Sequence, residues 1–190
     1  MRVLWFGTYS VGPGYPRNTV LIEALRSVGV EVVECHAPLF RGAQDKVNAA
    51  STALGRVRFG LKAMAAWVKL TLRFFRAGPR DLVMVGYTGH LDLQLARVLS
   101  LLRPAPLVLD AFLSPWDTVV NDRALLDRRA LGARMLYRLE RSSLRRADLV
   151  LTDTATHADY MAETFGVERD RFEPVPVGSL VRSRVPVGPG

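Results

Sequence analysis

Three short polar segments carry side chains that could bind or transform a ligand. Residues 87–90 read Tyr-Thr-Gly-His, residues 110–118 include two aspartates, and residues 153–154 are Asp-Thr. A carboxyl or imidazole group can transfer a proton, and a hydroxyl group can donate or accept a hydrogen bond. Asp110 and His90 are therefore the candidates for a catalytic group, although each position equally suits capping of a turn or a helix.

Other polar residues of these segments, and a glycine-containing loop nearer the N-terminus, are candidates for binding a substrate. The loop spans residues 7–17 and contains Gly12-Pro13-Gly14, before a helix expected to begin at Asn18. Small residues let the backbone approach a ligand closely, and the first amides of a helix favour an anion. A plain turn that needs glycine for its geometry is the alternative. The candidates are Gly12, Gly14, Asn18, Tyr87, Ser114, Asp117, Thr118 and Thr154.

Several common ligand sites do not fit this sequence. The loop lacks both the G-x-G-x-x-G spacing of dinucleotide-binding folds and the G-K-[ST] of phosphate loops. Cys35 is the only cysteine, and because neighbours on a strand point to opposite faces, it does not form a dyad with His36. His90 with Asp92 supplies only two ligands, so no metal site is predicted. We expect no tightly bound cofactor, and the cysteine count suits a reducing cytoplasm.

The elements that must position these residues are six short apolar, β-branched-rich runs that alternate with longer helical stretches. Near-continuous apolar runs are typical of parallel strands buried on both faces. The alternation therefore predicts one α/β domain, a doubly wound Rossmann-like parallel sheet of about six strands with helices on both faces. The predicted strands are residues 2–6, 30–35, 82–85, 107–110, 149–152 and 172–177.

Helices are predicted between the strands, and several of their ends carry capping residues. Asn18 and Thr154 suit N-terminal caps, whereas Gly29 and Gly166 suit C-terminal caps. Ligands of open parallel sheets bind beyond the carboxyl ends of the strands, so the segments that follow the strands should meet at one edge. The predicted helices are residues 18–28, 46–77, 90–102, 131–145 and 154–165.

The net charge of +8 favours an anionic partner, and one predicted helix concentrates that charge. Residues 46–80 contain no acidic residue, and at 100° per residue five basic side chains project into one sector of about 60°. We expect this basic stripe to face outward while residues 57, 61, 64, 68, 72 and 75 pack against the sheet. The stripe consists of Arg58, Lys62, Lys69, Arg73 and Arg76. A second basic group, at residues 128–146, is interrupted by Glu140 and reads as ordinary surface.

The order of these pieces resembles the N-terminal domain of family 4 retaining glycosyltransferases, whose two Rossmann-like domains face each other across a cleft (the GT-B architecture). The likeness lies in the opening strand and glycine loop at residues 2–14, in residues 110–118 and 146–154, and in "FEPVPVG" at residues 172–178. It covers residues 1–179 as one acceptor-side domain. The order and spacing of these motifs are more specific than any one of them.

The resemblance implies transfer of a sugar from a nucleotide-diphosphate sugar, a co-substrate held mainly by a C-terminal donor-binding domain. We expect that domain to be absent, residues 180–190 to be a truncated interdomain linker, and the chain alone to be inactive or nearly so. Many members have a histidine after the fourth strand, where this chain has Asp110-Ala111-Phe112, so that role does not transfer. No nucleophile is assigned.

Some members of that family act on lipid-linked acceptors and dock to anionic membranes through a helix in this part of the domain. The resemblance therefore implies that the basic stripe is a membrane surface, with an ordinary solvated face as the alternative. The leading hypothesis is a glycosyltransferase half that holds the sugar acceptor. The alternative is a non-catalytic, membrane-docked acceptor-binding subunit that recruits a separate donor-binding chain.

Other partners and locations are less consistent with the sequence. Nucleic-acid binding is disfavoured because no helix-turn-helix spacing, zinc finger or RNP-type aromatic motif accompanies the basic residues. No run of 18 uncharged apolar residues is present. We expect a cytoplasmic protein that is peripheral at the inner face of the cell membrane.

Overall fold

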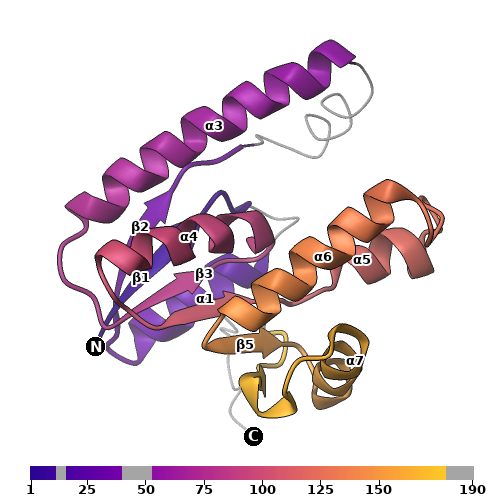
Figure 1. Cartoon of the computed structure of the whole chain (residues 1–190). Coiled ribbons are helices and arrows are strands. Elements are labelled where there is room, and N and C mark those ends of the chain that lie inside the picture. Colours follow the sequence, from indigo (N-terminus) through magenta and orange to yellow (C-terminus); the bar gives the residue numbers. More distant parts are fainter. Residues whose placement is uncertain (12–15, 40–52, 179–190) are drawn as a thin grey trace, which may run out of the picture.

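The centre of the molecule is a six-stranded, all-parallel sheet in the order β2-β1-β3-β4-β5-β6 (Figure 1). The computed structural model describes residues 1–11, 16–39 and 53–178. The strands are β1 (Arg2–Gly7), β2 (Glu31–His36), β3 (Leu82–Val85), β4 (Leu107–Asp110), β5 (Leu149–Thr152) and β6 (Phe172–Pro174). The six predicted strands and the doubly wound Rossmann-like fold are thus confirmed, with the strand order reversing between β1 and β3.

The long helices also agree with the prediction, and three short helical elements, α5, η1 and η2, were not predicted. The helices are α1 (Pro16–Ser27), α3 (Ala53–Arg76), α4 (His90–Leu102), α5 (Pro115–Asp117), α6 (Leu131–Arg146) and α7 (Ala155–Phe165), with a π-helical turn η1 (Thr118–Asp122) and a 3-10 turn η2 (Arg169–Arg171). Residues 46–52 of the predicted second helix lie outside the described residues.

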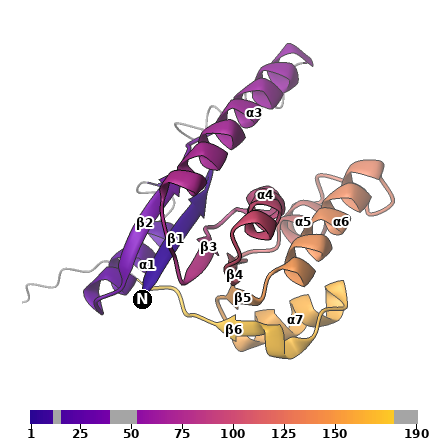
Figure 2. The same cartoon turned by 60° about the vertical axis from the view of Figure 1, so that its left-hand side comes forward.

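The two faces of the sheet are covered unequally. Along β1, Leu4 and Phe6 point into one core, whereas Val3 and Trp5 point into the other, because side chains alternate along a strand. The first core is shared with α3, α4, α6 and α7, and the second with Ile22 of α1. Figure 2 shows α4, α6 and α7 gathered on one side of the strands. Four helices of the described chain therefore cover one face of the sheet, and α1 covers the other.

Three of the four predicted caps are confirmed and one is wrong. Thr154 accepts a hydrogen bond from the backbone N–H of His157, and Gly166 ends α7 in the left-handed region with φ 60°. Asn18 does not cap α1, because the helix begins two residues earlier at Pro16, a residue that suits the first turn. Gly29 caps the end of α1 as predicted, with φ 82° in the left-handed region and its N–H donating to the carbonyl of Arg26 at 3.1 Å.

Helix α3 packs in a different rotation from the predicted one. Its buried side chains are Ala66, Leu70 and Phe74, four residues apart and therefore on one face of the helix. The apolar side chains predicted to pack on the sheet are instead mostly exposed. Their exposed fractions are 60% for Val57, 59% for Leu61, 60% for Met64, 56% for Val68 and 50% for Leu72, while Phe75 is half-buried. The rotation follows from the small side chain of Ala66, which lets the helix approach, and from a hydrogen bond of Trp67 to Asp92.

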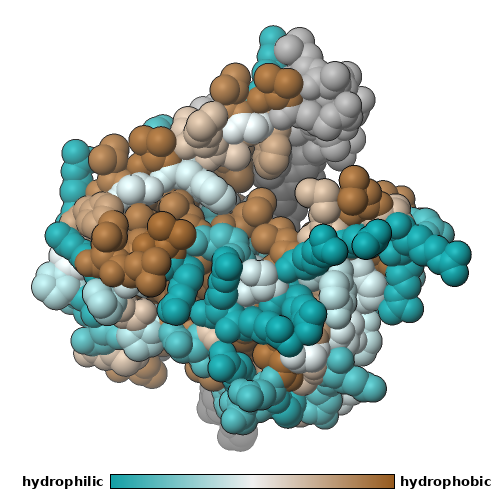
Figure 3. All heavy atoms as spheres, viewed as in Figure 1, coloured by the Kyte–Doolittle hydropathy of each residue, from teal (hydrophilic) through white to brown (hydrophobic). Residues whose placement is uncertain are grey.

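The exposed apolar side of α3 continues onto α4. Four large hydrophobic residues of α4 are exposed as well, and α3 contacts α4. They are Leu91, Val98, Leu101 and Leu102. Figure 3 shows the resulting hydrophobic surface over α3 and α4, beside a hydrophilic run along α6. Large exposed apolar patches are uncommon on monomeric proteins and mark interaction surfaces.

The unpredicted helix α5 depends on a tertiary contact. Glu140 of α6 is completely buried, and its Oε2 accepts the backbone N–H of Trp116 at 2.9 Å. Ser114 caps the same helix by accepting the N–H of Asp117 at 3.1 Å. Burial raises the pKa of Glu140 to about 7, although hydrogen bonds from Ser114 and Trp116 act to lower it. A carboxyl group distant in sequence therefore holds the segment that follows β4.

We expect the free energy of unfolding to fall as pH rises from about 4.5 through about 7, because folding then buries a carboxyl group that the unfolded chain would ionise freely. The loss is on the order of 3 kcal/mol for Glu140. In the Glu140→Gln variant, which stays neutral, this part of the decline should vanish. Urea unfolding of both proteins between pH 4 and pH 9 measures the difference, and two parallel pH profiles would contradict it.

Candidate functional site

A buried ion pair lies at the carboxyl edge of the sheet. Arg17, in the first turn of α1, donates from Nε to both oxygens of Asp110, at 2.9 and 3.0 Å. The two side chains are 5% and 0% exposed. Burial raises the pKa of Asp110 to about 6, while the guanidinium of Arg17 acts to lower it, so the carboxyl group is charged at neutral pH.

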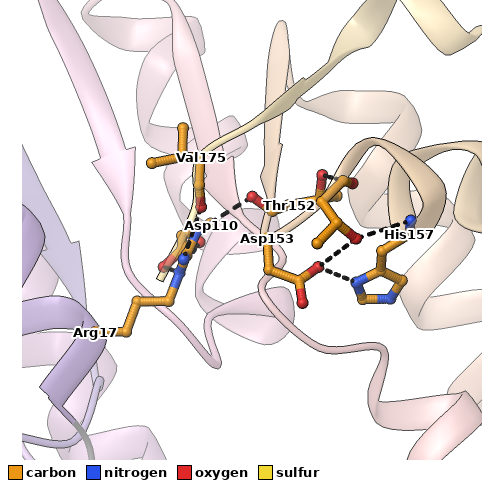
Figure 4. A network of polar contacts seen from close by, with 7 residues as sticks. Arg17, Asp110, Thr152, Asp153, His157 and Val175 are labelled. Carbon is orange, nitrogen blue, oxygen red and sulfur yellow. Dashed lines mark hydrogen bonds and ion pairs between the residues drawn. The ribbon is translucent and has the colours of Figure 1, made fainter. Parts of the chain in front are cut away.

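Arg17 also joins the ends of two further strands. Its terminal nitrogens donate to the carbonyl of Val175, just beyond β6, at 3.1 Å and to that of Thr152 in β5 at 3.5 Å (Figure 4). Its guanidinium lies 4.7 Å from the ring centre of Phe112. Sequence reasoning missed Arg17 because nothing in a loop before a helix shows that an arginine points inward.

The loops that follow β1 and β3 are fastened to each other by Asn18. Its Nδ2 donates to the carbonyls of Tyr87 at 2.8 Å and Ser10 at 3.2 Å. The ring of Tyr87 meets Phe112 edge-on at 5.4 Å, which extends the contact to the loop after β4. The predicted residues Asn18 and Tyr87 therefore come together, with Asn18 buried as a connector.

The glycines that permit this close packing lie at the strand ends. Gly7 has φ 138°, and a Cβ there would stand 2.9 Å from Oδ2 of Asp92. A Cβ on Gly86 would stand 2.6 Å from Oδ1 of Asn18. The predicted Gly12 and Gly14 lie outside the described residues.

Asp92 ties the first loop to two helices. Its Oδ2 accepts the backbone N–H and the hydroxyl of Thr8 at 2.7 and 2.8 Å, and its Oδ1 accepts Nε1 of Trp67 at 3.1 Å. Burial raises the pKa of Asp92, although these hydrogen bonds act to lower it. The contacts give Asp92 a positioning role at the start of α4.

His90, the other catalytic candidate, lies beneath the surface at the first residue of α4. The side chain is 4% exposed, and neither ring nitrogen has a hydrogen-bond partner among the described residues. Burial lowers its pKa to about 4, so the imidazole is neutral at physiological pH. Both candidate catalytic groups are thus buried, and a catalytic role for either stays a prediction.

The predicted residues after β4 form a second polar group with α7. Asp117 accepts hydrogen bonds from Tyr160 and Asn121, and Thr118 is half-buried beside it. Ser114 is 2% exposed and caps α5, so its hydroxyl is occupied by the backbone. Of the three predicted residues, Asp117 and Thr118 are partly exposed.

A carboxylate and an imidazole follow β5 and meet at the same edge. Nδ1 of His157 lies 2.8 Å from Oδ1 of Asp153, and the side chains are 17% and 26% exposed (Figure 4). Partial burial raises the pKa of Asp153, but the hydrogen bond from His157 outweighs it and holds that pKa below its usual range. Thr154 between them caps α7. His157 was missed, although its place four residues after Asp153, within the first turn of a helix, is a readable signal.

Cys35 and His36 occupy opposite faces of β2, as predicted. The Cys35 thiol is buried and donates to the carbonyl of Leu70 at 3.5 Å. Burial raises its pKa to about 12, so the thiol is not a nucleophile. The ring of His36 stacks on Tyr9 at 4.1 Å. Within the described residues, no group of three or more His, Cys, Asp or Glu side chains is placed to hold a metal ion.

All five residues of the basic stripe on α3 are exposed. Three of them, Lys62, Lys69 and Arg73, line a hollow of about 630 Å³. Residues 36–39, which run from the end of β2 into the following loop, line it as well. Arg73 also donates to the carbonyl of His36. The stripe therefore borders the segment beyond β2, next to the exposed apolar side of the helix. None of the helices in the described part of the chain has the length and hydrophobicity needed to span a bilayer.

The chain is similar to one protein family and to a solved structure. Residues 10–178 match the family described as the Glycosyl transferase 4-like domain. The crystal structure of Anabaena Alr3699/HepE in complex with UDP and glucose aligns with 94% of this chain at a TM-score of 0.55 and 15% sequence identity. The chain spans 45% of that protein, and the likeness shows the fold. A search of curated protein sequences found no match to the present chain.

Replacing Arg17 by leucine is expected to destabilise the fold by about 3–5 kcal/mol, because Asp110 is left buried without its partner. The double variant Arg17→Leu/Asp110→Leu should recover at least half of that loss, since no buried charge remains. Urea unfolding of the wild type, both single variants and the double variant measures the coupling. Additive effects of the two single changes would contradict a direct interaction.

Proposed function

Because the chain belongs to the Glycosyl transferase 4-like family, we propose that it forms the acceptor-side half of a two-domain glycosyltransferase. The single observation that carries this proposal is the family match over residues 10–178. In the proposed reaction, a sugar passes from a nucleotide-diphosphate sugar to an acceptor held by this domain. A C-terminal donor-binding domain would supply most contacts to the nucleotide, in keeping with the 45% of Alr3699/HepE that this chain spans.

The carboxyl edge of the sheet is where this proposal puts the acceptor. In doubly wound sheets, ligands bind where the strand order reverses, here between β1 and β3. Tyr87 and the exposed Thr88 follow β3, and Asp117 with Thr118 follow β4. Hydroxyl and carboxylate groups of this kind suit the hydroxyl groups of a saccharide.

The proposed reaction is described without a side-chain nucleophile, since none is assigned. Sugar transfer passes through an oxocarbenium-like transition state, and the departing diphosphate needs preorganised hydrogen-bond donors. The attacking hydroxyl group needs an acceptor for its proton. Asp110 is paired with Arg17 and His90 is buried, whereas the side chains of Asp153 and His157 are partly exposed, so this pair is the candidate group for contact with a ligand. Its role at the cleft is to orient the acceptor or the leaving phosphate.

Calorimetric titration of the 190-residue chain with UDP-glucose or GDP-mannose should give dissociation constants weaker than about 1 mM, because the proposed donor contacts lie in another domain. The fluorescently labelled chain should nonetheless retain a discrete class of glycans on a saccharide array. Replacing Tyr87 and Thr118 by alanine should reduce that retention several-fold. Tight one-to-one binding of either sugar nucleotide, or no retained saccharide, would count against the proposal.

We further propose that α3 attaches the domain to an anionic membrane surface. An interfacial helix presents an exposed apolar face beside a basic one, and α3 does so with Leu61, Val68 and Leu72 next to Lys62 and Lys69. The apolar residues of α4 extend this face. The exposed apolar side strengthens the membrane hypothesis, since a solvated basic helix would not need it.

Flotation with vesicles of phosphatidylglycerol and phosphatidylcholine tests the attachment. Changing Lys62, Lys69 and Arg73 to glutamate should weaken binding by at least about 100-fold, at roughly 1 kcal/mol for each base lost near the surface. The variant Leu61→Ser/Val68→Ser should also bind weakly, because it removes insertion without changing charge.

The control for the vesicle experiment carries the same change of charge elsewhere. Arg123, Arg129 and Arg145 are exposed residues that lie outside α3, and their replacement by glutamate should leave most of the binding intact. Equal losses in the two triple variants would show an effect of net charge alone. Unchanged binding of the α3 variants would refute the proposed membrane surface.

A further inference from the structure

The second basic group of the chain surrounds a hollow between α6 and α7. This hollow has a volume of about 740 Å³ and is lined by both helices, by Trp116 of α5 and by Arg128. That volume lies within the range of small-molecule sites, roughly 300–1,000 Å³. It lies at the opposite end of the helix layer from α3, because α3 contacts α4, α4 contacts α6, and α6 contacts α7.

Four guanidinium groups face this hollow against one carboxylate, that of Glu163. Arg134, Arg138 and Arg141 lie four and three residues apart, so they project from one face of α6. Figure 3 shows the hydrophilic run that follows this helix. The sequence predicts an ordinary surface for this basic group because Glu140 interrupts it. The structure buries Glu140 on the other side of the helix, where it neutralises none of them.

Two of the arginines have no ionic partner within the part of the chain that the structure describes. Among the described residues, neither Arg134 nor Arg138 lies within ion-pair distance of a carboxylate. Arg141 is fixed by donating from Nε to the carbonyl of Phe165 at 2.9 Å, and Arg128 lies 5.2 Å from the ring centre of Trp116. Like charges gathered around one hollow repel each other, and an oxyanion bound among them relieves that repulsion.

The floor beneath these arginines is held in place by its own contacts. Tyr137 stacks on Phe165 at 5.1 Å and donates its hydroxyl group to the carbonyl of Thr164 at 2.9 Å. Tyr160, on the α7 side, is fixed by its hydrogen bond to Asp117. The hollow therefore combines rigid aromatic walls with guanidinium groups that remain free to bind.

We infer that this hollow, the α6–α7 pocket, binds the phosphate or diphosphate group of a small molecule. Guanidinium groups bind phosphate oxygens through paired hydrogen bonds, and several of them together suit a ligand with more than one negative charge. The volume exceeds what one phosphate group fills, which leaves room for the rest of the molecule against Tyr137 and Tyr160. The inference does not rest on the proposed transfer of a sugar, because the observations that carry it are the hollow itself and the arginines around it.

Calorimetry with inorganic pyrophosphate tests the pocket. The variant Arg134→Gln/Arg138→Gln should weaken binding at least about ten-fold, because two charge-assisted contacts are lost. Both side chains are exposed, so the variant should fold, and circular dichroism checks this. Amide resonances of residues 160–164, which include pocket residues, should shift when pyrophosphate binds the wild type.

The matched control is Arg97→Gln/Arg123→Gln, which removes the same charge from exposed positions outside the pocket. Its affinity for pyrophosphate should stay within about two-fold of the wild type, since screening weakens distant charges. Equal losses in both variants, or no measurable binding of pyrophosphate to the wild type, would overturn the inference.

A vesicle experiment distinguishes a soluble phosphate from a lipid headgroup. Flotation with vesicles that contain phosphatidic acid should be the same for the pocket variant and its control, because the pocket takes a soluble ligand. A loss of flotation in the pocket variant that the control variant does not share would overturn the assignment to a soluble small molecule.

Discussion

The buried ion pair between Arg17 and Asp110 is the constraint that organises the carboxyl edge of the sheet. A charged pair removed from water is tolerated only when its remaining donors are satisfied, and Arg17 uses them on the carbonyls of Thr152 and Val175. One side chain thereby sets the relative positions of α1, β4, β5 and the chain beyond β6. Asn18, one residue later, adds the loop after β3. The edge is therefore built as one unit.

The titratable side chains near this edge are of two kinds, those buried by contacts with other elements and those that stay partly exposed. Asp110, Asp92 and Glu140 are buried and hold backbone or side-chain donors from other elements. Such groups position loops, and each would be costly to expose or to leave unpaired. Asp117, and Asp153 with His157, remain accessible. A ligand at the edge would meet these groups on a scaffold that the buried carboxylates keep rigid.

The helix layer presents two unlike surfaces at its two ends. At one end, α3 exposes apolar and basic side chains together because its buried face is limited to Ala66, Leu70 and Phe74. At the other end, α6 exposes arginines around rigid aromatic rings. Apolar insertion beside positive charge suits a bilayer, whereas guanidinium groups around a hollow suit a discrete anion. The net charge of +8 is thus divided between surfaces with different chemistry.

The sequence by itself determined the fold class, the six strands and the long helices, because continuous apolar runs and caps such as Thr154 and Gly166 are local signals. It also placed the polar segments at the ends of the strands. Only the tertiary structure decided which polar groups are buried. It paired Arg17 with Asp110, turned α3 so that its apolar side is exposed, and used Glu140 to hold α5. Periodicity gives the faces of a helix, but the rotation of a helix depends on the fit of side chains from distant elements, which no local pattern contains.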